Sequence, residues 1–159
     1  MAPSPRIQLA LLCATVALAA GPRADASTLV VPADSNLIAR SELVVIGRVV
    51  ATGAVEQDSK IWTEASVAVE ERIKGNSADI VTVREPGGTL ADRMSVVFGS
   101  PELIAGERVL LFLAERPGGA YRTVDLAAGK FSERTDRAGS RFWFRDLRRS
   151  GSGRAPRPG

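Results

Sequence analysis

Few kinds of catalysis are open to this chain, because the side chains that most enzymes use are scarce. The 159 residues include no histidine and one cysteine, Cys13. This composition excludes a Ser-His-Asp triad and the usual imidazole-based zinc and copper sites. Neither a P-loop nor a G-x-G-x-x-G motif after an apolar run is present. The chemistry that remains possible is carboxylate catalysis, a Ser–Lys pair, or the binding of calcium or magnesium through oxygen ligands.

Carboxylates on neighbouring strands could form a catalytic pair, and the candidates are Glu64, Glu70, Glu71 and Glu85. A solvated strand face is the commoner arrangement for such residues, because charged side chains are mostly exposed. No D-x-D-x-D-G loop is present, and no serine forms a recognisable motif with a lysine. We therefore predict a non-catalytic protein without a cofactor or a metal site.

Trp62 is the first candidate for contact with a partner. It lies on the polar face of a predicted strand, together with Glu64 and Ser66. An exposed tryptophan on a barrel face would form a stacking or protein-contact site. The alternative, which we favour because large aromatic side chains are usually buried, is that the short helix or the tail covers it.

Trp143 is the second candidate. Arg141, Trp143 and Arg145 share one face of a predicted strand, and Phe142 and Phe144 share the other. Interleaved basic and aromatic side chains are typical of single-stranded nucleic acid binding. An exported protein would instead meet an anionic glycan, a lipid headgroup or an acidic protein. The alternative, which we favour, is that Phe142 and Phe144 close the core while the arginines keep the tail soluble.

The first 26 residues have the pattern of a cleaved secretory signal peptide. Arg6 provides a positive charge, Ile7–Ala20 is apolar, and Ala24 and Ala26 form a small-x-small site before Ser27. The apolar run is shorter than the ~20 residues that cross a bilayer, and no later run approaches that length. We therefore expect a secreted or periplasmic protein without a transmembrane segment.

Removal of the signal peptide, with Cys13, would leave one domain without disulfides over 27–149. The residues from Ser27 to Glu133 include 11 basic and 15 acidic side chains, whereas those from Arg134 onward include 8 arginines and 2 acids. Residues 150–159 contain too little apolar content to pack, so a disordered basic tail is predicted.

The strand pattern indicates how the candidate residues would be positioned. The stretch Ile61–Gly75 alternates apolar and polar side chains, which is typical of a half-buried strand, and a turn over Lys74–Ser77 is predicted to end it. Leu43–Ala51 is apolar on both faces, and Gly47 within it would suit a bend or bulge. Gly53–Lys60 is predicted as a polar connection. Further strands are predicted at Asp79–Arg84, Met94–Phe98, Arg108–Ala114, Ala120–Leu126, Lys130–Arg134 and Arg141–Arg145.

A short helix over Asn36–Ser41, with Leu37 and Ile38 as its apolar contacts, precedes these strands. Six to eight short strands with Gly-rich turns predict an all-β, OB-like small barrel with one short N-terminal helix. A β-sandwich is the alternative.

Four segments, SELVVIGRVV, VAVEERIKG, GERVLLFL and YRTVDLAAGKF, resemble a family of small exported bacterial proteins of uncharacterised function. They lie between Ser41 and Phe131 and are distantly similar to netrin-like domains, the OB-fold modules that include tissue inhibitors of metalloproteinases. The resemblance implies an OB-like fold. Those inhibitors bind a protease's zinc through an N-terminal cysteine, which a chain beginning at Ser27 lacks, so no functional residue transfers.

These observations predict a non-catalytic binding or interaction module that contacts a protein or an anionic envelope component. Nucleic acid is not expected as a partner. One alternative is an inhibitor or accessory domain for an exported protease, and another is a carboxylate-based hydrolase. A concave cluster of acids would favour the hydrolase, and a flat apolar patch around Trp62 would favour the interaction module.

Overall fold

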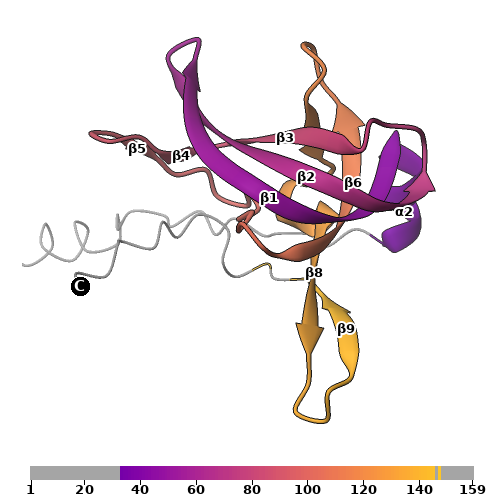
Figure 1. Ribbon diagram of the computed structural model, residues 1–159. Helices are drawn as coiled ribbons and strands as arrows, with labels where there is room; N and C mark the ends of the chain where they lie inside the picture. Colours follow the sequence, from indigo (N-terminus) through magenta and orange to yellow (C-terminus); the bar gives the residue numbers. More distant parts are fainter. Residues whose placement is uncertain (1–32, 146, 148–159) are drawn as a thin grey trace, which may run out of the picture. The chain divides into compact units, whose positions relative to one another are not determined.

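The computed structural model describes residues 33–145 and 147. The predicted signal peptide with Ala24, Ala26 and Ser27, and the predicted tail over 150–159, lie outside the described residues. The elements in Figure 1 are α2 (Asp34–Arg40), β1 (Leu43–Gln57), β2 (Lys60–Lys74), β3 (Ile80–Pro86), β4 (Gly88–Thr89), β5 (Met94–Ser95), β6 (Arg108–Glu115), β7 (Tyr121–Thr123), the 3-10 helix η1 (Leu126–Gly129), β8 (Lys130–Thr135) and β9 (Arg141–Phe144). No helix in this part of the chain has the length and apolar character needed to cross a membrane.

Five of the strands close into a ring. They follow the order β1-β2-β3-β7-β6, and β1 also pairs with β6. Neighbours in the ring are antiparallel except β3 and β7, which run parallel and share one residue pair, Val83 and Tyr121. The predicted all-β fold is confirmed, and a closed five-stranded ring is the arrangement of a small OB-like barrel. The β3–β7 seam is the join with the fewest backbone pairs.

Strand β1 is strongly curved, as Figure 1 shows, and pairs with β2 on one edge and with β6 on the other, which closes the sheet into a ring. Its register against β2 shifts between Val44 and Val45, between Ile46 and Gly47, and between Val49 and Ala51. Each shift is a bulge or irregularity that bends the strand. The bend predicted at Gly47 is therefore confirmed.

The predicted end of this strand at Ala51 is wrong, because β1 continues to Gln57 and β2 begins at Lys60. Only Asp58 and Ser59 separate them, with φ of 52° and 60°. Two successive residues with positive φ match the right-handed twist of a β-hairpin. The polar composition of this segment indicated a loop, but exposed strand ends are polar as well.

The barrel interior contains buried aliphatic side chains from β1, β2, β3 and β6, together with Leu103. They are Leu43, Val45, Val49, Ala65, Val67, Val81, Val83, Leu103, Val109, Leu111 and Leu113. A second cluster lies beneath α2 and consists of Leu37, Val44, Phe112 and Val124. The helix was predicted with Leu37 and Ile38 as contacts; Leu37 is fully buried, whereas Ile38 is 49% exposed.

Two predicted strands are shorter than expected. The strand predicted over Met94–Phe98 ends at Ser95, and its partner is the two-residue β4. The strand predicted over Ala120–Leu126 ends at Thr123, because Asp125 and Leu126 adopt φ of 53° and 56° and lead into η1. Positive φ is incompatible with an extended strand.

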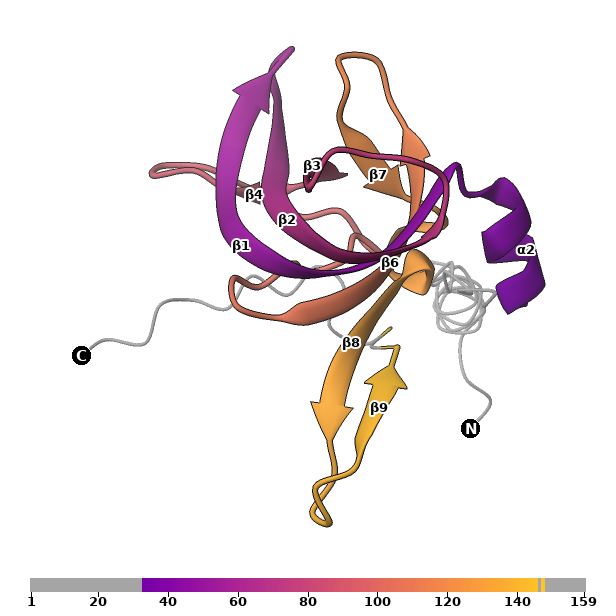
Figure 2. The same ribbon diagram turned by 45° about the vertical axis from the view of Figure 1, so that its right-hand side comes forward.

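Strand β8 leaves the ring. It pairs with Val109–Leu111 of β6 and then continues as a hairpin with β9. Figure 2 shows this β8–β9 hairpin extending away from the five-stranded ring. Among the strands of residues 33–145, β9 pairs with β8 alone.

Candidate functional site

A hollow of about 240 Å³ lies between the β1–β2 turn and the β6–β7 turn. Figures 1 and 2 show these two turns at the same end of the barrel. The hollow is lined by Gln57, Asp58, Trp62, Arg84, Arg116, Pro117, Ala120 and Arg122. The Trp62 hollow thus combines an indole with three guanidinium groups.

Tertiary structure brings these residues together from three hairpins. Trp62 pairs with Val55 of β1 and with Pro86 of β3, which places it beside the β1–β2 turn. The β6–β7 turn is closed by the amide of Arg116, which donates to the carbonyl oxygen of Ala120 at 2.8 Å. The two turns therefore form opposite walls of the hollow.

Trp62 is half-buried. Its neighbours in the hollow come from the β1–β2 turn, from β3, and from β7 and the β6–β7 turn, and α2 is not among them. Helix α2, one of the two covering elements that the sequence analysis favoured, therefore does not line the hollow; the other, the tail over 150–159, lies outside the described residues. Trp62 itself lines the hollow.

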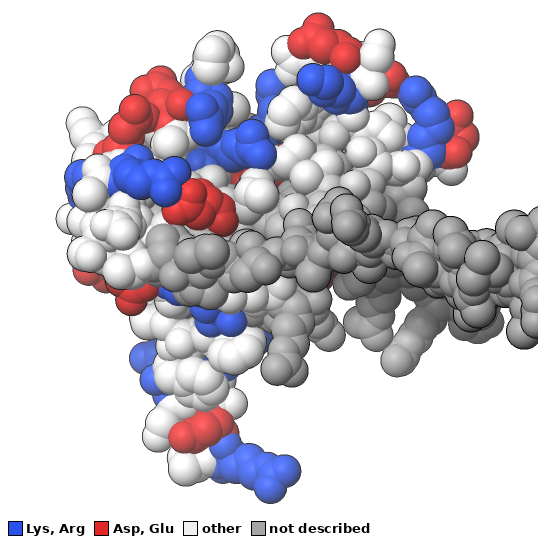
Figure 3. Space-filling view, turned by 180° about the vertical axis from the view of Figure 1, so that it is seen from behind, with Lys and Arg blue, Asp and Glu red and all other residues white. Residues whose placement is uncertain are grey.

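The three arginines of the hollow differ in their partners. Arg84 donates to Glu64 Oε1 at 2.7 Å and to Gln57 Oε1 at 2.5 Å. Arg122 Nε lies 3.8 Å from Glu85 Oε2. Arg116 forms no ion pair within the described part of the chain. Figure 3 shows basic side chains at this end of the molecule, with acidic side chains interspersed.

Glu85 is fully buried at the β3–β7 seam. Its Oε1 accepts hydrogen bonds from the amide of Thr123 at 2.7 Å and from Thr123 Oγ1 at 2.8 Å. Its Oε2 has no hydrogen-bond partner among the described residues. Burial raises the pKa of Glu85 to about 7, against the opposing effects of the Thr123 hydrogen bonds and of Arg122. Glu85 therefore does not lie on a solvated strand face, which was the arrangement expected for most of the candidate glutamates.

The other candidate glutamates are engaged by arginines or exposed. Glu64 pairs with Arg84, and Glu70 accepts from Arg108 at 2.5 Å. Glu71 is exposed. Within residues 33–145 and 147, no group of three or more acidic, histidine or cysteine side chains could hold a metal ion. These contacts are typical of structural ion pairs.

Trp143 lies in the β8–β9 hairpin, apart from the residues of the Trp62 hollow. The guanidinium of Arg108 lies 5.7 Å from the centre of the Trp143 ring. Arg108 also donates to Glu133 at 2.6 Å, and Arg141 lies 3.7 Å from the same glutamate. This network ties the hairpin to the barrel.

The predicted role of the two phenylalanines as core residues is wrong. Phe142 and Phe144 are 47% and 44% exposed and belong to neither core cluster of the described chain, because the β8–β9 hairpin extends away from the ring. Trp143 and Arg145 are half-buried instead. Arg145 lies over the ring of Phe131 at 4.2 Å and pairs with Asp34 at 2.5 Å, so it is a structural residue.

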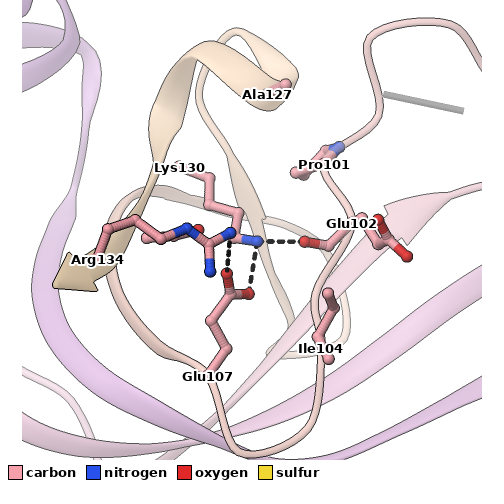
Figure 4. Close-up of a pocket in the computed structure, with 8 residues that line it drawn as sticks. Pro101, Glu102, Ile104, Glu107, Ala127, Lys130 and Arg134 are labelled. Atoms are coloured by element: carbon pink, nitrogen blue, oxygen red, sulfur yellow. Dashed lines mark hydrogen bonds and ion pairs between the residues drawn. The ribbon is translucent and has the colours of Figure 1, made fainter. Parts of the chain in front are cut away.

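A small pocket beside β8 contains Lys130, one of the three lysines of the chain. Figure 4 shows the amine of Lys130 directed at the Glu102 carbonyl and at Glu107 Oε2, the latter at 2.7 Å. Arg134 lies 3.8 Å from the other oxygen of Glu107. The pocket, which Ser132 also lines, has a volume of about 20 Å³, enough for about one water. The amine is thus a donor in a closed ion-pair cluster.

Comparisons of the chain with protein-family models, with curated proteins and with solved structures found no match. The function is therefore argued from the fold and the Trp62 hollow.

The sequence analysis identified Trp62 but missed Arg84, Arg116 and Arg122. Their only local signal is that Arg116 and Arg122 flank a Pro-Gly-Gly turn. Residues on both sides of a tight hairpin turn lie close together, so this signal could have placed two of the arginines. Their proximity to Trp62 depends on ring closure.

Proposed function

We propose that the protein is an exported, non-catalytic binding module that holds an acidic segment of a partner protein in the Trp62 hollow. The observation that carries the proposal is the hollow itself, in which a half-buried indole meets three guanidinium groups. Tryptophan and arginine are the residues that most often dominate the energy of protein interfaces. Arg116, without an ion-pair partner in the described chain, would supply a charge for a carboxylate.

The shape of the site favours a protein segment over a membrane surface. A hollow of about 240 Å³ accommodates one or two side chains rather than a broad array of headgroups. Acidic side chains also belong to the site, since Asp58 lines it and Glu64 pairs with Arg84. An anionic lipid surface would be repelled by these acids, whereas a single segment can avoid them.

The test uses Trp62 as its own fluorescent reporter. The chain has two tryptophans, so Trp143→Phe leaves Trp62 alone. We expect the emission of this full-length variant to change on titration with a hexaglutamate peptide and not with hexaglutamine. Added Arg116→Gln should weaken binding severalfold, because it removes the unpaired charge.

Arg137→Gln is the matched control, since Arg137 is an exposed arginine in the β8–β9 turn. It should leave the affinity unchanged. A response to anionic phospholipid vesicles but not to hexaglutamate would overturn the commitment to a protein partner. An Arg137→Gln effect equal to that of Arg116→Gln would show that net charge, and not the hollow, drives binding.

A further inference from the structure

We propose that Arg122 binds the carboxylate of the acidic partner, and that Glu85 competes for this arginine, so that the hollow holds its partner more tightly when Glu85 is protonated. This inference rests on the proposed function and adds its regulation. It is based on two observations. Glu85 Oε2 has no hydrogen-bond partner among the described residues, and Arg122, its nearest cation, also lines the hollow.

The unsatisfied atom is Glu85 Oε2. It is buried and has no hydrogen-bond partner in the described chain, while Oε1 accepts two hydrogen bonds from Thr123. The nearest cation is the Arg122 guanidinium, at 3.8 Å, which is an ion-pair distance too long for a hydrogen bond. The side chain of Arg122 is 29% exposed, so a ligand in the hollow can reach it.

The charge of the site depends on Glu85. The hollow and its ion-pair partners contain three arginines (Arg84, Arg116 and Arg122) and three acids (Asp58, Glu64 and Glu85). Their formal charges cancel when every group is ionised. Protonation of Glu85 leaves one positive charge in excess, beside the arginine that it would otherwise neutralise.

The groups that face Glu85 make this protonation accessible. Burial raises the pKa of Glu85 to about 7, and the charged side chains that oppose the shift are Arg122 on β7 and Arg116 in the β6–β7 turn. On the neighbouring strand β2, Thr63 is the ladder partner of Glu85, and a threonine does not titrate near neutral pH. The positive charge of Arg122 stabilises the ionised form of Glu85. A ligand carboxylate bound at Arg122 would partly neutralise that charge and so favour protonated Glu85 further.

The experiment measures hexaglutamate affinity of the full-length chain at pH 6 and pH 8. The peptide's carboxylates have pKa values near ~4.3 and stay ionised at both. We expect binding about fivefold tighter at pH 6, the change that one pKa unit of coupling produces over this range. Glu85→Gln should bind at both pH values with the affinity that the native chain shows at pH 6.

Glu64→Gln is the matched control, because it removes a carboxylate from Arg84 in the same hollow. It should raise the affinity at both pH values and keep the pH dependence. Equal affinities at pH 6 and pH 8 in the native chain would overturn this inference and leave the proposed function standing. Absence of binding at both pH values would overturn the proposed function and this inference with it.

A second measurement needs no substitution. Calorimetric titration at pH 7 in buffers of different ionisation enthalpy reports the protons taken up on binding. Competition between the ligand and Glu85 requires net proton uptake. A binding enthalpy independent of the buffer would contradict the proposal, whatever the variants show.

Discussion

At the scale of the residue, Glu85 is the side chain whose surroundings fit its charge least. A buried carboxylate is normally paired and fully hydrogen-bonded. Glu85 instead has one oxygen bound to Thr123 and one with no hydrogen bond in the described chain. The same carboxylate joins β7 to β3 where the backbone supplies one residue pair, so a titrating group takes part in closing the ring.

This position predicts that the protein is more stable in mild acid than in mild base. The pKa of Glu85 is raised from 4.5 to about 7, so the folded chain holds the proton more tightly than the unfolded chain. Its contribution to stability is full below about pH 4.5 and is lost as pH rises through about 7. The difference amounts to at most about 3 kcal/mol.

Urea denaturation of the full-length chain at pH 5 and pH 8 measures this contribution. Glu85→Gln should remove most of the decrease, whereas Glu64→Gln should retain it. A free energy of unfolding that rises from pH 5 to pH 8 at the same rate in the native chain and in Glu85→Gln would contradict the assignment.

At the scale of the element, the curvature of β1 depends on Gly47. An added Cβ there would lie 2.5 Å from the carbonyl oxygen of Ala68 and 2.8 Å from Val67 Cγ1. The opposing strand β2 therefore leaves no space for a side chain at this bulge. A strand that must pair on both edges needs this close approach.

We expect Gly47→Ala to lower the free energy of unfolding by about 1–3 kcal/mol, because backbone atoms of β2 must move. Gly53→Ala is the control in the same strand, since nothing lies within 4 Å of its added Cβ. That variant should be close to neutral. Equal losses in the two variants, measured by urea denaturation, would mean that backbone entropy and not packing decides the effect.

At the scale of the molecule, the two tryptophans have different roles. Trp143 belongs to the Arg108 network that ties the β8–β9 hairpin to the barrel, and Trp62 lines the hollow. No residue that lines the hollow takes part in the Trp143 network. Stability and binding should therefore respond separately to the two side chains.

We expect Trp143→Ala to lower the free energy of unfolding by about 1–2 kcal/mol, through lost burial and the lost cation–π contact. Its affinity for hexaglutamate should remain within about twofold of the native value. Trp62→Ala should weaken the binding of hexaglutamate, and it should lower the free energy of unfolding less than Trp143→Ala does. Isothermal calorimetry measures the affinity of each variant, and thermal unfolding measures its stability. Weaker binding by Trp143→Ala would contradict the separate roles of the two tryptophans.

Local patterns predicted much of the fold. The alternation in Ile61–Lys74 and the apolar run that begins at Leu43 correspond to β2 and β1, and Gly47 lies at a bulge. Element ends were less predictable. Polar residues continue β1 to Gln57, and Asp125 and Leu126 end the β7 region through positive φ that their side chains do not signal.

The sequence by itself determined the fold class and excluded histidine chemistry, because strand periodicity and composition are local properties. Only the tertiary structure decided that Glu85 is buried and that Arg84, Arg116 and Arg122 surround Trp62. Residues 62 and 116 meet because the ring closes through β6 and β7, and local alternation does not specify that closure. The charge and pKa of the site arise from this long-range packing.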